Sequence, residues 1–486
     1  MAESGYRKFA RDIGILVLTD IAVAVKSLLV LPVIAKLLGA SAYGIWVQAI
    51  VTITLLAMFC DLNLSAALAR FLAAEKDRGK IREGFLTVTL FAIGGGAFLT
   101  LLIILFRYQI AGMLFHDVGS AQLVFIIAIT IPFYELNAVA VAFFRALREI
   151  KTYSWFVIGR ELLLIAILIP LVLGGFGISG ALGAFLLSYF IVDAVMFALI
   201  LSRTGLSIPR FADLRPYLKF SLPTIPNSLS GWLVSSSDRY VISFMLGTAS
   251  VGIYSASYGL GSVISYFSAP LSFILIPTLS KLYDERNFNE VKVHMSYSLK
   301  YFLMFAIPGV CGLSVLAVPV LRILTTAEFV TVASIIVPLI AVGYLCFGLY
   351  VVFSQVFIML KRMNIIGIQW MVVAGTNLVL NIIFVRAIGI TGAAVATFAV
   401  YLMALVWVAV LARRYLRFPI EWQFILKSLG ASLVMSLVIW RLNPSGIPMT
   451  LLTVAAGAIV YFTVLFLLQG FKKQEIEFFK SVLRRS

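Results

Sequence analysis

The chain has 486 residues, of which 62% are hydrophobic and only 12% charged, and its formal net charge is +17. A soluble protein with a polar surface does not use so large an apolar share. The composition therefore excludes an ordinary soluble domain and predicts an integral membrane protein.

Fourteen apolar runs follow one another along the chain, each near the roughly 20 residues that a helix needs to cross the hydrocarbon core. They cover residues 13–37, 42–69, 84–106, 120–143, 153–174, 180–202, 217–246, 250–280, 300–320, 330–359, 364–387, 390–412, 425–441 and 447–470. Only helices and closed barrels satisfy backbone polar groups in lipid, and these runs are far too long for barrel strands. We therefore expect an all-α integral membrane protein with fourteen transmembrane helices.

The positions of Lys and Arg predict how these helices are oriented. If the N-terminus is cytoplasmic, the outer loops hold only Arg107, Arg322, Arg386 and Arg441. Most other basic residues then fall in cytoplasmic segments, as the positive-inside rule expects. The sequence thus predicts a multi-pass protein of the cell (inner) membrane with both termini in the cytoplasm. The same rule explains the positive charge without nucleic acid as a partner.

Two short motifs recur along the chain. LGASAYGIW at residues 38–46 recurs as LGTASVGIY at 246–254, and GISGA at 177–181 recurs as GITGA at 389–393. Both recurrences shift the chain by six helices, which preserves orientation in the membrane, so they indicate parallel repeats. We expect an amino-terminal lobe over residues 1–205, a carboxy-terminal lobe over 206–415, and two extra helices with a cytoplasmic tail over 416–486.

Ten of the ionisable side chains inside the apolar runs are candidates for a structural or functional role. They are Asp20, Lys26, Lys36, Asp61, Glu135, Arg160, Glu161, Asp193, Asp238 and Arg239. An unpaired charge at mid-membrane costs about 2.5 to 3.5 kcal/mol, so these groups must pair, reach the interface or face water. Lys36 lies near a helix end and is expected to reach the interface. We interpret Arg160 and Glu161 as structural residues near the cytoplasmic end of the fifth helix.

Several stretches occur together in a recognisable order: residues 34–44, Asp61 to Leu64, Asp238 and Arg239 followed by Val251 to Ser255, and Asn377, Asn381, Gly389 and Gly392. On fourteen runs, this pattern resembles the polysaccharide (oligosaccharide) flippase family of the multidrug/oligosaccharidyl-lipid/polysaccharide exporter superfamily. The resemblance implies two six-helix lobes forming a V around a cavity, with two extra helices. It also implies alternating access that moves a polyprenyl-pyrophosphate-linked oligosaccharide from the cytoplasmic to the outer leaflet, for cell-surface polysaccharide biosynthesis.

The resemblance implies a transporter rather than an enzyme, without a cofactor. Its expected partners are the lipid-linked glycan, membrane lipids and polysaccharide polymerase or export proteins, and it is expected to function as a monomer. Two alternatives remain: an ion-coupled multidrug exporter of the same superfamily, and a membrane glycan polymerase. No P-loop is visible, so an ion gradient, the membrane potential or removal of product is expected to supply the energy.

The resemblance places the first and seventh helices along the cavity, which makes their charged residues candidates for substrate binding. Lys26 and Arg239 are the expected anion ligands, because a cation in a low-dielectric cavity attracts phosphate and arginine binds it through a bidentate fork. The full set of candidates is Lys26, Arg239, Asp20, Asp61, Asp238, Arg145 and Arg148.

A structural alternative exists for each of these candidates. Lys26 could form an internal salt bridge with Asp20 or Asp61, and Asp238 could simply neutralise Arg239. Arg145 and Arg148 either attract the lipid-linked anion at the cytoplasmic end of the fourth helix or only obey the positive-inside rule.

Asp238, Asn377, Asn381 and Thr397 lie at a common expected depth of about 10 Å below the outer surface. Their oxygens are hard ligands for a small cation such as Na⁺. The set resembles the cation site in the carboxy-terminal lobe of the related lipid II flippase. Alternatively, the asparagines are hydrogen-bond links between helices. Another proton or sodium site, by resemblance to drug exporters of the superfamily, is Asp20, Glu135 and Asp193.

The remaining reactive side chains indicate no other metal or catalytic site. Cys60, Cys311 and Cys346 all lie in apolar stretches, which gives neither a disulfide framework nor a metal-ligand spacing. His116 and His294 lie far apart in short polar connections, so no histidine-based catalytic or zinc site is expected.

Overall fold

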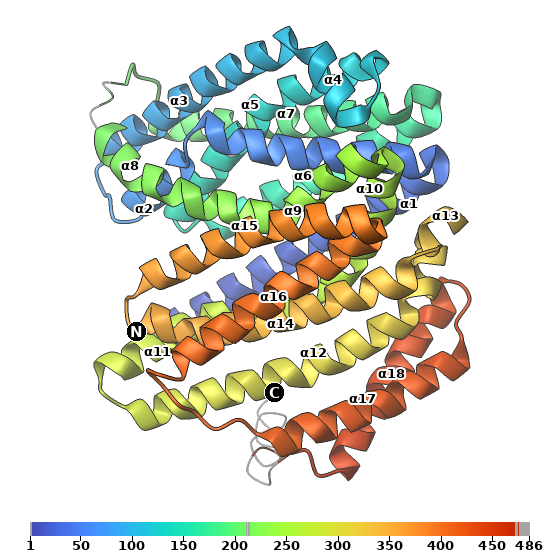
Figure 1. The fold of residues 1–486 in the computed structure, drawn as a ribbon. Helices are drawn as coiled ribbons and strands as arrows, with labels where there is room; N and C mark the ends of the chain where they lie inside the picture. Colours follow the sequence, from blue (N-terminus) through green and yellow to red (C-terminus); the bar gives the residue numbers. More distant parts are fainter. Residues whose placement is uncertain (1, 210, 212–213, 472–474, 476–486) are drawn as a thin grey trace. The chain divides into compact units, whose positions relative to one another are not determined.

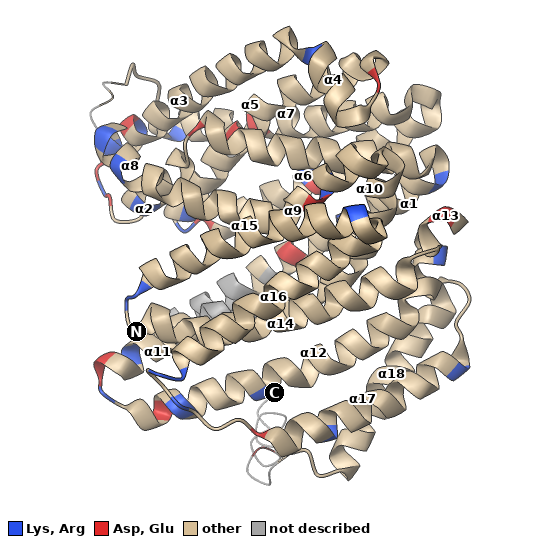
Figure 2. Ribbon diagram, in the orientation of Figure 1, with Lys and Arg blue, Asp and Glu red and all other residues tan. Residues whose placement is uncertain are grey.

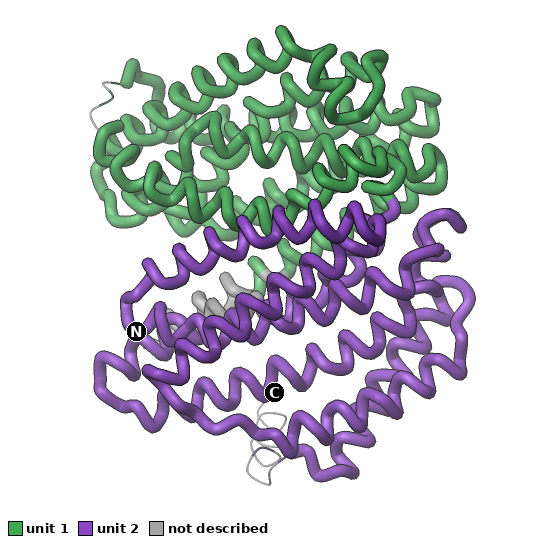
Figure 3. Tube along the Cα trace, viewed as in Figure 1, with its two compact units in different colours: residues 1–252 green, residues 253–486 purple. Residues whose placement is uncertain are grey.

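The computed structural model describes every residue except 1, 210, 212–213, 472–474 and 476–486 (Figure 1). The described residues form helices and no strand, which confirms the all-helical prediction. They divide into two compact units, residues 1–252 and 253–486 (Figure 3). The cytoplasmic tail expected after residue 471 lies almost wholly outside the described residues.

Unit 1 is built from helices joined by short connections. Its elements are α1 (Ala2–Cys60), α2 (Leu64–Leu72), α3 (Arg78–Leu105), α4 (Arg107–Phe115), η1 (Val118–Ser120), α5 (Ala121–Ala146), α6 (Ile150–Leu171), η2 (Val172–Phe176), α7 (Gly177–Thr204), α8 (Leu214–Ser221), η3 (Leu222–Thr224) and α9 (Ile225–Leu246). Helix α5 packs against α1, α2, α3 and α7, so it forms the centre of this unit. Helix α9 packs on α1, where the Tyr240 and Thr52 hydroxyls lie 2.7 Å apart.

Unit 2 begins within α10 (Thr248–Gly261), which runs across the boundary between the units. Its other elements are η4 (Ser262–Phe267), α11 (Ala269–Asp284), α12 (Phe288–Leu324), α13 (Ala327–Val330), α14 (Ala333–Met359), α15 (Met363–Ile388), α16 (Ile390–Ala412), α17 (Trp422–Leu442) and α18 (Ile447–Leu467). Helix α14 packs against α11, α12 and α16, and α17 joins α12 to α18.

The two extra carboxy-terminal helices are tied to α12 by a buried tyrosine. Tyr461 of α18 donates a hydrogen bond to the Met304 carbonyl oxygen at 2.8 Å, and its hydroxyl lies 2.9 Å from that of Ser428 in α17. Gly457 lets the two helices approach closely, because a Cβ there would lie 2.9 Å from Ile439. These helices are therefore part of unit 2. The lobe boundaries expected after residues 205 and 415 stay predictions.

Ten helical segments are long and apolar enough to cross a membrane within the part of the chain that the structure describes. Two are much longer than one crossing: residues 14–60 with 47 residues and residues 150–204 with 55. Because a helix rises about 1.5 Å per residue and the hydrocarbon core is about 30 Å thick, each of these contains two crossings. The chain is therefore an all-helical, multi-pass membrane protein.

The repeated glycines adopt the same backbone conformation in both copies of each motif. Gly39 has φ 84° and ψ 179°, and its counterpart Gly247 has φ 84° and ψ 172°. Gly177 has φ 56° and ψ −143°, and its counterpart Gly389 has φ 65° and ψ −148°. Side chains strongly disfavour these positive φ values, so glycine is required where each helix turns into the next. The two copies of each sequence motif thus form the same type of turn.

The two copies of the first motif also touch each other. A Cβ on Gly44 would lie 1.8 Å from the carbonyl oxygen of Thr248, and one on Gly252 would lie 2.2 Å from that of Ala40. The hydroxyls of Ser41 and Thr248 lie 2.9 Å apart at the same contact. Thr248, which faces Gly44, and Ala40, which faces Gly252, occupy equivalent positions in the two copies. The contact is therefore symmetric. Small residues permit this backbone approach, in which Cα–H groups meet carbonyl oxygens.

Candidate functional site

The helix expected over residues 42–69 breaks at Asp61, which corrects the prediction of one continuous span. Leu62 and Asn63 have φ values of 52° and 61°, and α2 begins at Leu64. The Asp61 carboxylate accepts hydrogen bonds from the backbone N–H groups of Asn63 and Ser65, both at 2.8 Å. These bonds satisfy amides that the break removes from the helix, which is how a broken helix is tolerated within a membrane.

Two further polar side chains surround this break. The Asn63 amide donates to the hydroxyls of Thr224 at 3.2 Å and Ser228 at 3.0 Å, linking the break to η3 and α9. Glu135 of α5 is buried, and its carboxyl group interacts electrostatically with that of Asp61. The break therefore brings together two buried carboxyl groups in unit 1.

A chain of charged and polar side chains connects four helices of unit 1. Lys26 Nζ of α1 lies 3.1 Å from Glu161 Oε2 of α6, and Arg160 contacts the other oxygen of that carboxylate at 2.5 Å. Arg160 also donates to Asn137 Oδ1 of α5 at 2.6 Å, and the Asn137 amide donates to Asp193 Oδ1 of α7 at 2.6 Å. The chain thus links two cations and two carboxyl groups, with the Asn137 amide between Arg160 and Asp193.

Aromatic rings enclose the middle of this charge chain. The Arg160 guanidinium lies 4.5 Å from the centre of the Tyr189 ring, which packs in turn against Tyr134 at 5.3 Å. Burial strengthens the attraction between the charges but also removes their hydration, so each needs its partner. The Lys26 side chain is 18% exposed, against 6% for Glu161, which makes Lys26 the accessible end of the chain.

The sequence pointed to only part of this chain. Lys26 was a candidate, but its partner is Glu161 and not Asp20, which is exposed and interacts electrostatically with Arg145. The interpretation of Arg160 and Glu161 as residues near a helix end is wrong, because they lie inside α6 and contact Lys26 of α1. Asn137 was missed, although an asparagine within an apolar run is itself a signal of a polar network.

Asp238 and Arg239 form a second buried ion pair, on α9. Arg239 contacts Asp238 Oδ1 at 2.6 Å, and its guanidinium also donates to the carbonyl oxygen of Ser235. Both side chains are buried, at 1% and 7% exposure. Asp238 therefore neutralises Arg239 in this structure, which is the structural alternative considered for the pair.

Arg145 and Arg148 lie exposed at the end of α5 and in the turn that follows it. Arg148 has φ 56°, so it forms part of the tight connection to α6. The next residue, Glu149, holds Arg203 through both carboxylate oxygens at 2.9 and 3.0 Å. Arg145 and Arg148 are surface residues of unit 1 and do not belong to the charge chain.

The other candidate cation ligands lie in unit 2. Asn377 and Asn381 share one face of α15, and the Asn381 amide donates to the Asn377 carbonyl oxygen at 2.9 Å and to its side-chain oxygen at 3.0 Å. Both are fully buried, as is Thr397 of α16. Within the described part of the chain, Asn381 Oδ1 and the Thr397 hydroxyl have no hydrogen-bond partner. Asp238 belongs to unit 1, so a cation site formed by Asp238 together with these oxygens stays a prediction.

Broken helices, duplicated turns and buried ion pairs within apolar spans define a class, the secondary transporters. Solved structures of such proteins have a similar fold. The lipid II flippase MurJ in its inward closed conformation aligns over 92% of this chain and 97% of its own, with a TM-score of 0.75 and 21% identity. An inward-facing multidrug transporter of the MATE family and MOP superfamily aligns over 82% and 94%, with a TM-score of 0.65 and 17% identity.

Residues 9–283 match the family described as polysaccharide biosynthesis protein, and the chain belongs to that family. A curated relative is the probable low-salt glycan biosynthesis flippase Agl15 of Haloferax volcanii, which is 24% identical over 369 residues and 75% of each chain. The protein is therefore a multi-pass membrane transporter of the flippase type and not an enzyme. This sets aside the glycan polymerase considered from the sequence.

Proposed function

We propose that this chain is a flippase that moves a polyprenyl-pyrophosphate-linked oligosaccharide from the cytoplasmic to the outer leaflet by alternating access, for cell-surface polysaccharide biosynthesis. The observation that carries the proposal is the charge chain within the spans of unit 1, which ends at the partly exposed Lys26. Its cations suit an anionic pyrophosphate, whereas a drug exporter for cations needs acidic groups without such partners. Membership of a polysaccharide biosynthesis family supports the same substrate class.

We propose fourteen spans in this transporter. The ten candidate spans become twelve when the two long segments are counted as two crossings each. Helix α9, which is polar at Asp238 and Arg239, and the bent stretch from α10 to α11 supply two more. The matched glycine turns support two parallel six-helix lobes in a V-shaped arrangement, followed by α17 and α18 as extra helices. The positive-inside rule supports cytoplasmic termini.

We assign Lys26 and Arg239 as the anion ligands of the transported lipid. The pyrophosphate competes with Glu161 for Lys26 and with Asp238 for Arg239, so each carboxylate neutralises its cation when the site is empty. Asp20, Asp61 and Asp238, which lie on the same helices or at their ends, are the further candidates for the substrate cavity. The exposed Arg145 and Arg148 attract the lipid-linked anion to the cytoplasmic side.

Coupling to an ion is proposed at two alternative places. Asp238, Asn377, Asn381 and Thr397 supply oxygens suited to Na⁺. The alternative proton or sodium site is Asp20, Glu135 and Asp193 in unit 1, where Asp193 accepts a hydrogen bond from Asn137. The variant Asp238→Asn is expected to weaken the sodium dependence of transport, and transport by the wild type that ignores both Na⁺ and pH excludes both sites.

The decisive experiment follows the lipid-linked oligosaccharide in cells that lack this gene. We expect it to accumulate in the cytoplasmic leaflet and to return to normal on expression of the wild-type chain. Normal glycan export in the deletion strain, with no second flippase present, contradicts the proposal. Drug hypersensitivity of the same strain with normal glycan would instead identify a multidrug exporter. We further propose that the protein acts as a monomer alongside polysaccharide polymerase or export proteins, which cross-linking tests.

A further inference from the structure

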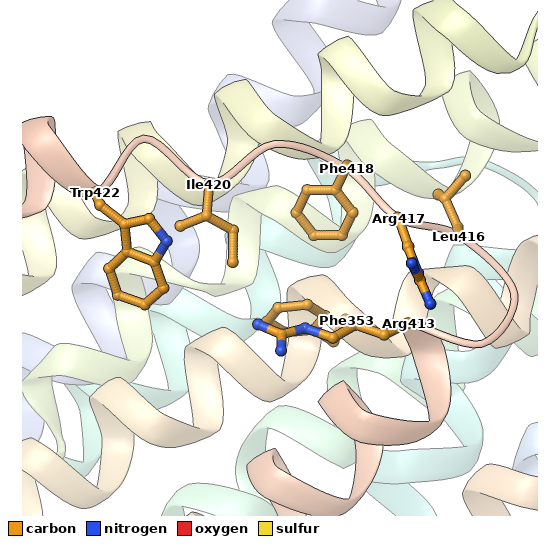
Figure 4. Close-up of a pocket in the computed structure, with 7 residues that line it drawn as sticks. All are labelled: Phe353, Arg413, Leu416, Arg417, Phe418, Ile420 and Trp422. Atoms are coloured by element: carbon orange, nitrogen blue, oxygen red, sulfur yellow. The ribbon is translucent and has the colours of Figure 1, made fainter.

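A cavity in unit 2 places two arginines beside aromatic and aliphatic side chains. It has a volume of about 450 Å³ and lies between α14, the end of α16 and the linker that leads to α17. Figure 4 shows the linker, with Arg417 and Phe418, running along one side of it. The residues that line it are Phe353, Arg413, Leu416, Arg417, Phe418, Ile420 and Trp422.

An apolar groove continues from this cavity along the helices. A second cavity, also of about 450 Å³, shares four of the lining residues and is otherwise lined by apolar side chains. These come from residues 299–307 of α12, 345–349 of α14 and 405–410 of α16, with Ile425 of α17. Eight residues of helix rise about 12 Å, so the groove accommodates several methylene groups of an extended hydrocarbon chain.

The linker that carries the arginines is held in place by contacts on both sides of them. Phe418 packs on Phe353 with ring centres 5.4 Å apart, and Tyr415 packs on Phe357 at 5.8 Å. At the end of the linker, Glu421 lies 3.0 Å from the buried Lys300 amine. The wall of the cavity that the linker forms is therefore packed against the helices of unit 2.

The side chains of Arg413 and Arg417 are exposed and have neither an ion pair nor a hydrogen bond with any described residue. Their neighbour Arg362, in contrast, donates to the Tyr415 hydroxyl at 2.7 Å. Two available guanidinium groups at the mouth of an apolar groove complement an anionic headgroup that carries a hydrocarbon chain. Val406 and Val410, more than half exposed along the groove, give such a chain access from the surrounding lipid.

We propose that this groove binds an anionic phospholipid of the cytoplasmic leaflet, with its phosphate on Arg413 and Arg417 and one acyl chain along α12, α14 and α16. Trp422, which is 63% exposed, lies beside the arginines, as aromatic residues do at the level of lipid headgroups. The bound lipid fills the groove and fixes the linker before α17. The proposal depends on the membrane setting and not on which glycan the protein transports.

The test uses the full-length protein in detergent, with native mass spectrometry to measure retention of dioleoyl phosphatidylglycerol and of its neutral analogue dioleoyl phosphatidylcholine. We expect the wild type to prefer phosphatidylglycerol. The double variant R413Q/R417Q should weaken that binding roughly 30-fold, because each arginine near a headgroup contributes about a factor of five. R441Q removes an exposed arginine elsewhere on α17 and serves as the matched control, with unchanged binding.

A second variant tests the apolar part of the site. Ala409→Trp fills the groove and should reduce retention of phosphatidylglycerol while leaving both arginines in place; helix content measured by circular dichroism monitors folding. Equal retention of the two lipids, or full binding by a folded R413Q/R417Q variant, overturns the proposal. Displacement of phosphatidylglycerol by an equimolar polyprenyl phosphate also overturns it, because the groove would then serve the transported lipid.

Discussion

Among the described residues, unit 1 buries several charged side chains inside its spans beside amides and hydroxyls. In unit 2 the buried polar groups are mostly amides and hydroxyls, and the buried Lys300 is paired with Glu421 and Glu475. Lys26, Arg160, Glu161, Asp238 and Arg239 all form ion pairs in unit 1. The corresponding buried groups of unit 2 are Gln355, Gln369, Asn377, Asn381 and Thr397. Figure 2 shows the basic residues of α15 and its N-cap at the two ends of this helix.

This difference corresponds to two roles that polar side chains have inside a membrane span. An amide or hydroxyl inside the bilayer links helices at modest cost, and Gln369 does so by donating to the Ala404 carbonyl oxygen at 2.8 Å. A buried charge is expensive even when it is paired, and replacing such a pair by apolar residues often stabilises a protein. The ion pairs within the spans of unit 1 are therefore candidates for a role beyond folding, and we propose that this role is the binding of an anion.

The variant Arg160→Met should have the largest effect on unit 1. It removes the hydrogen-bond donor to Asn137 and leaves Glu161 with Lys26 as its remaining cation. Removal of one partner from a buried ion pair costs about 3 to 5 kcal/mol. We expect a large drop in the melting temperature of the purified protein and loss of glycan export. Arg215→Met, which removes an exposed arginine of α8 in the same unit, should change neither. A wild-type melting temperature for Arg160→Met would show that the charge chain does not hold the four helices together.

Arg239→Ala tests whether the second ion pair serves transport. We expect glycan export to be abolished while the protein still inserts into the membrane, because the guanidinium is assigned to the substrate and α9 keeps its packing on α1. Export in the deletion strain and the amount of protein in the membrane fraction are measured together. Arg386→Ala, an exposed arginine of α15, is the matched control in unit 2. Normal export by Arg239→Ala would remove this residue from the substrate site.

The sequence predicted features that depend on composition and periodicity better than features that depend on contacts. Apolar runs predicted the helices, and the LGxxxxGI repeat predicted turns that the structure repeats at Gly39 and Gly247. The partner of Lys26 could not be predicted, because helices pack by shape and Glu161 lies on a distant run. The break at Asp61 was also missed, since a carboxylate that caps α2 looks like any other charge in a span.

Gly44→Leu tests the contact between the two copies of the motif. A side chain at Gly44 collides with the Thr248 backbone, so overpacking should destabilise the protein by about 1 to 3 kcal/mol. Thermal unfolding of the purified protein measures the change. Gly94→Leu provides the control, since no atom lies within 4 Å of a Cβ at that position. If both variants unfold at the wild-type temperature, the contact between the motif copies adds nothing to stability.

Asn381→Leu should have the smallest effect and addresses unit 2. It removes the two hydrogen bonds to Asn377, and side-chain hydrogen bonds between membrane-buried groups contribute about 0.6 kcal/mol on average and at most about 1.7. A loss of stability within that range, with sodium dependence of transport unchanged, means that the asparagines of α15 link structure only. Loss of sodium dependence at near-normal stability means that they bind the coupling ion, and the contrast between a charged, functional unit 1 and a structural unit 2 then fails. Asn377→Leu, measured in parallel and combined with Asn381→Leu in a double-mutant cycle, separates the pair's own hydrogen bond from contributions that each residue makes elsewhere.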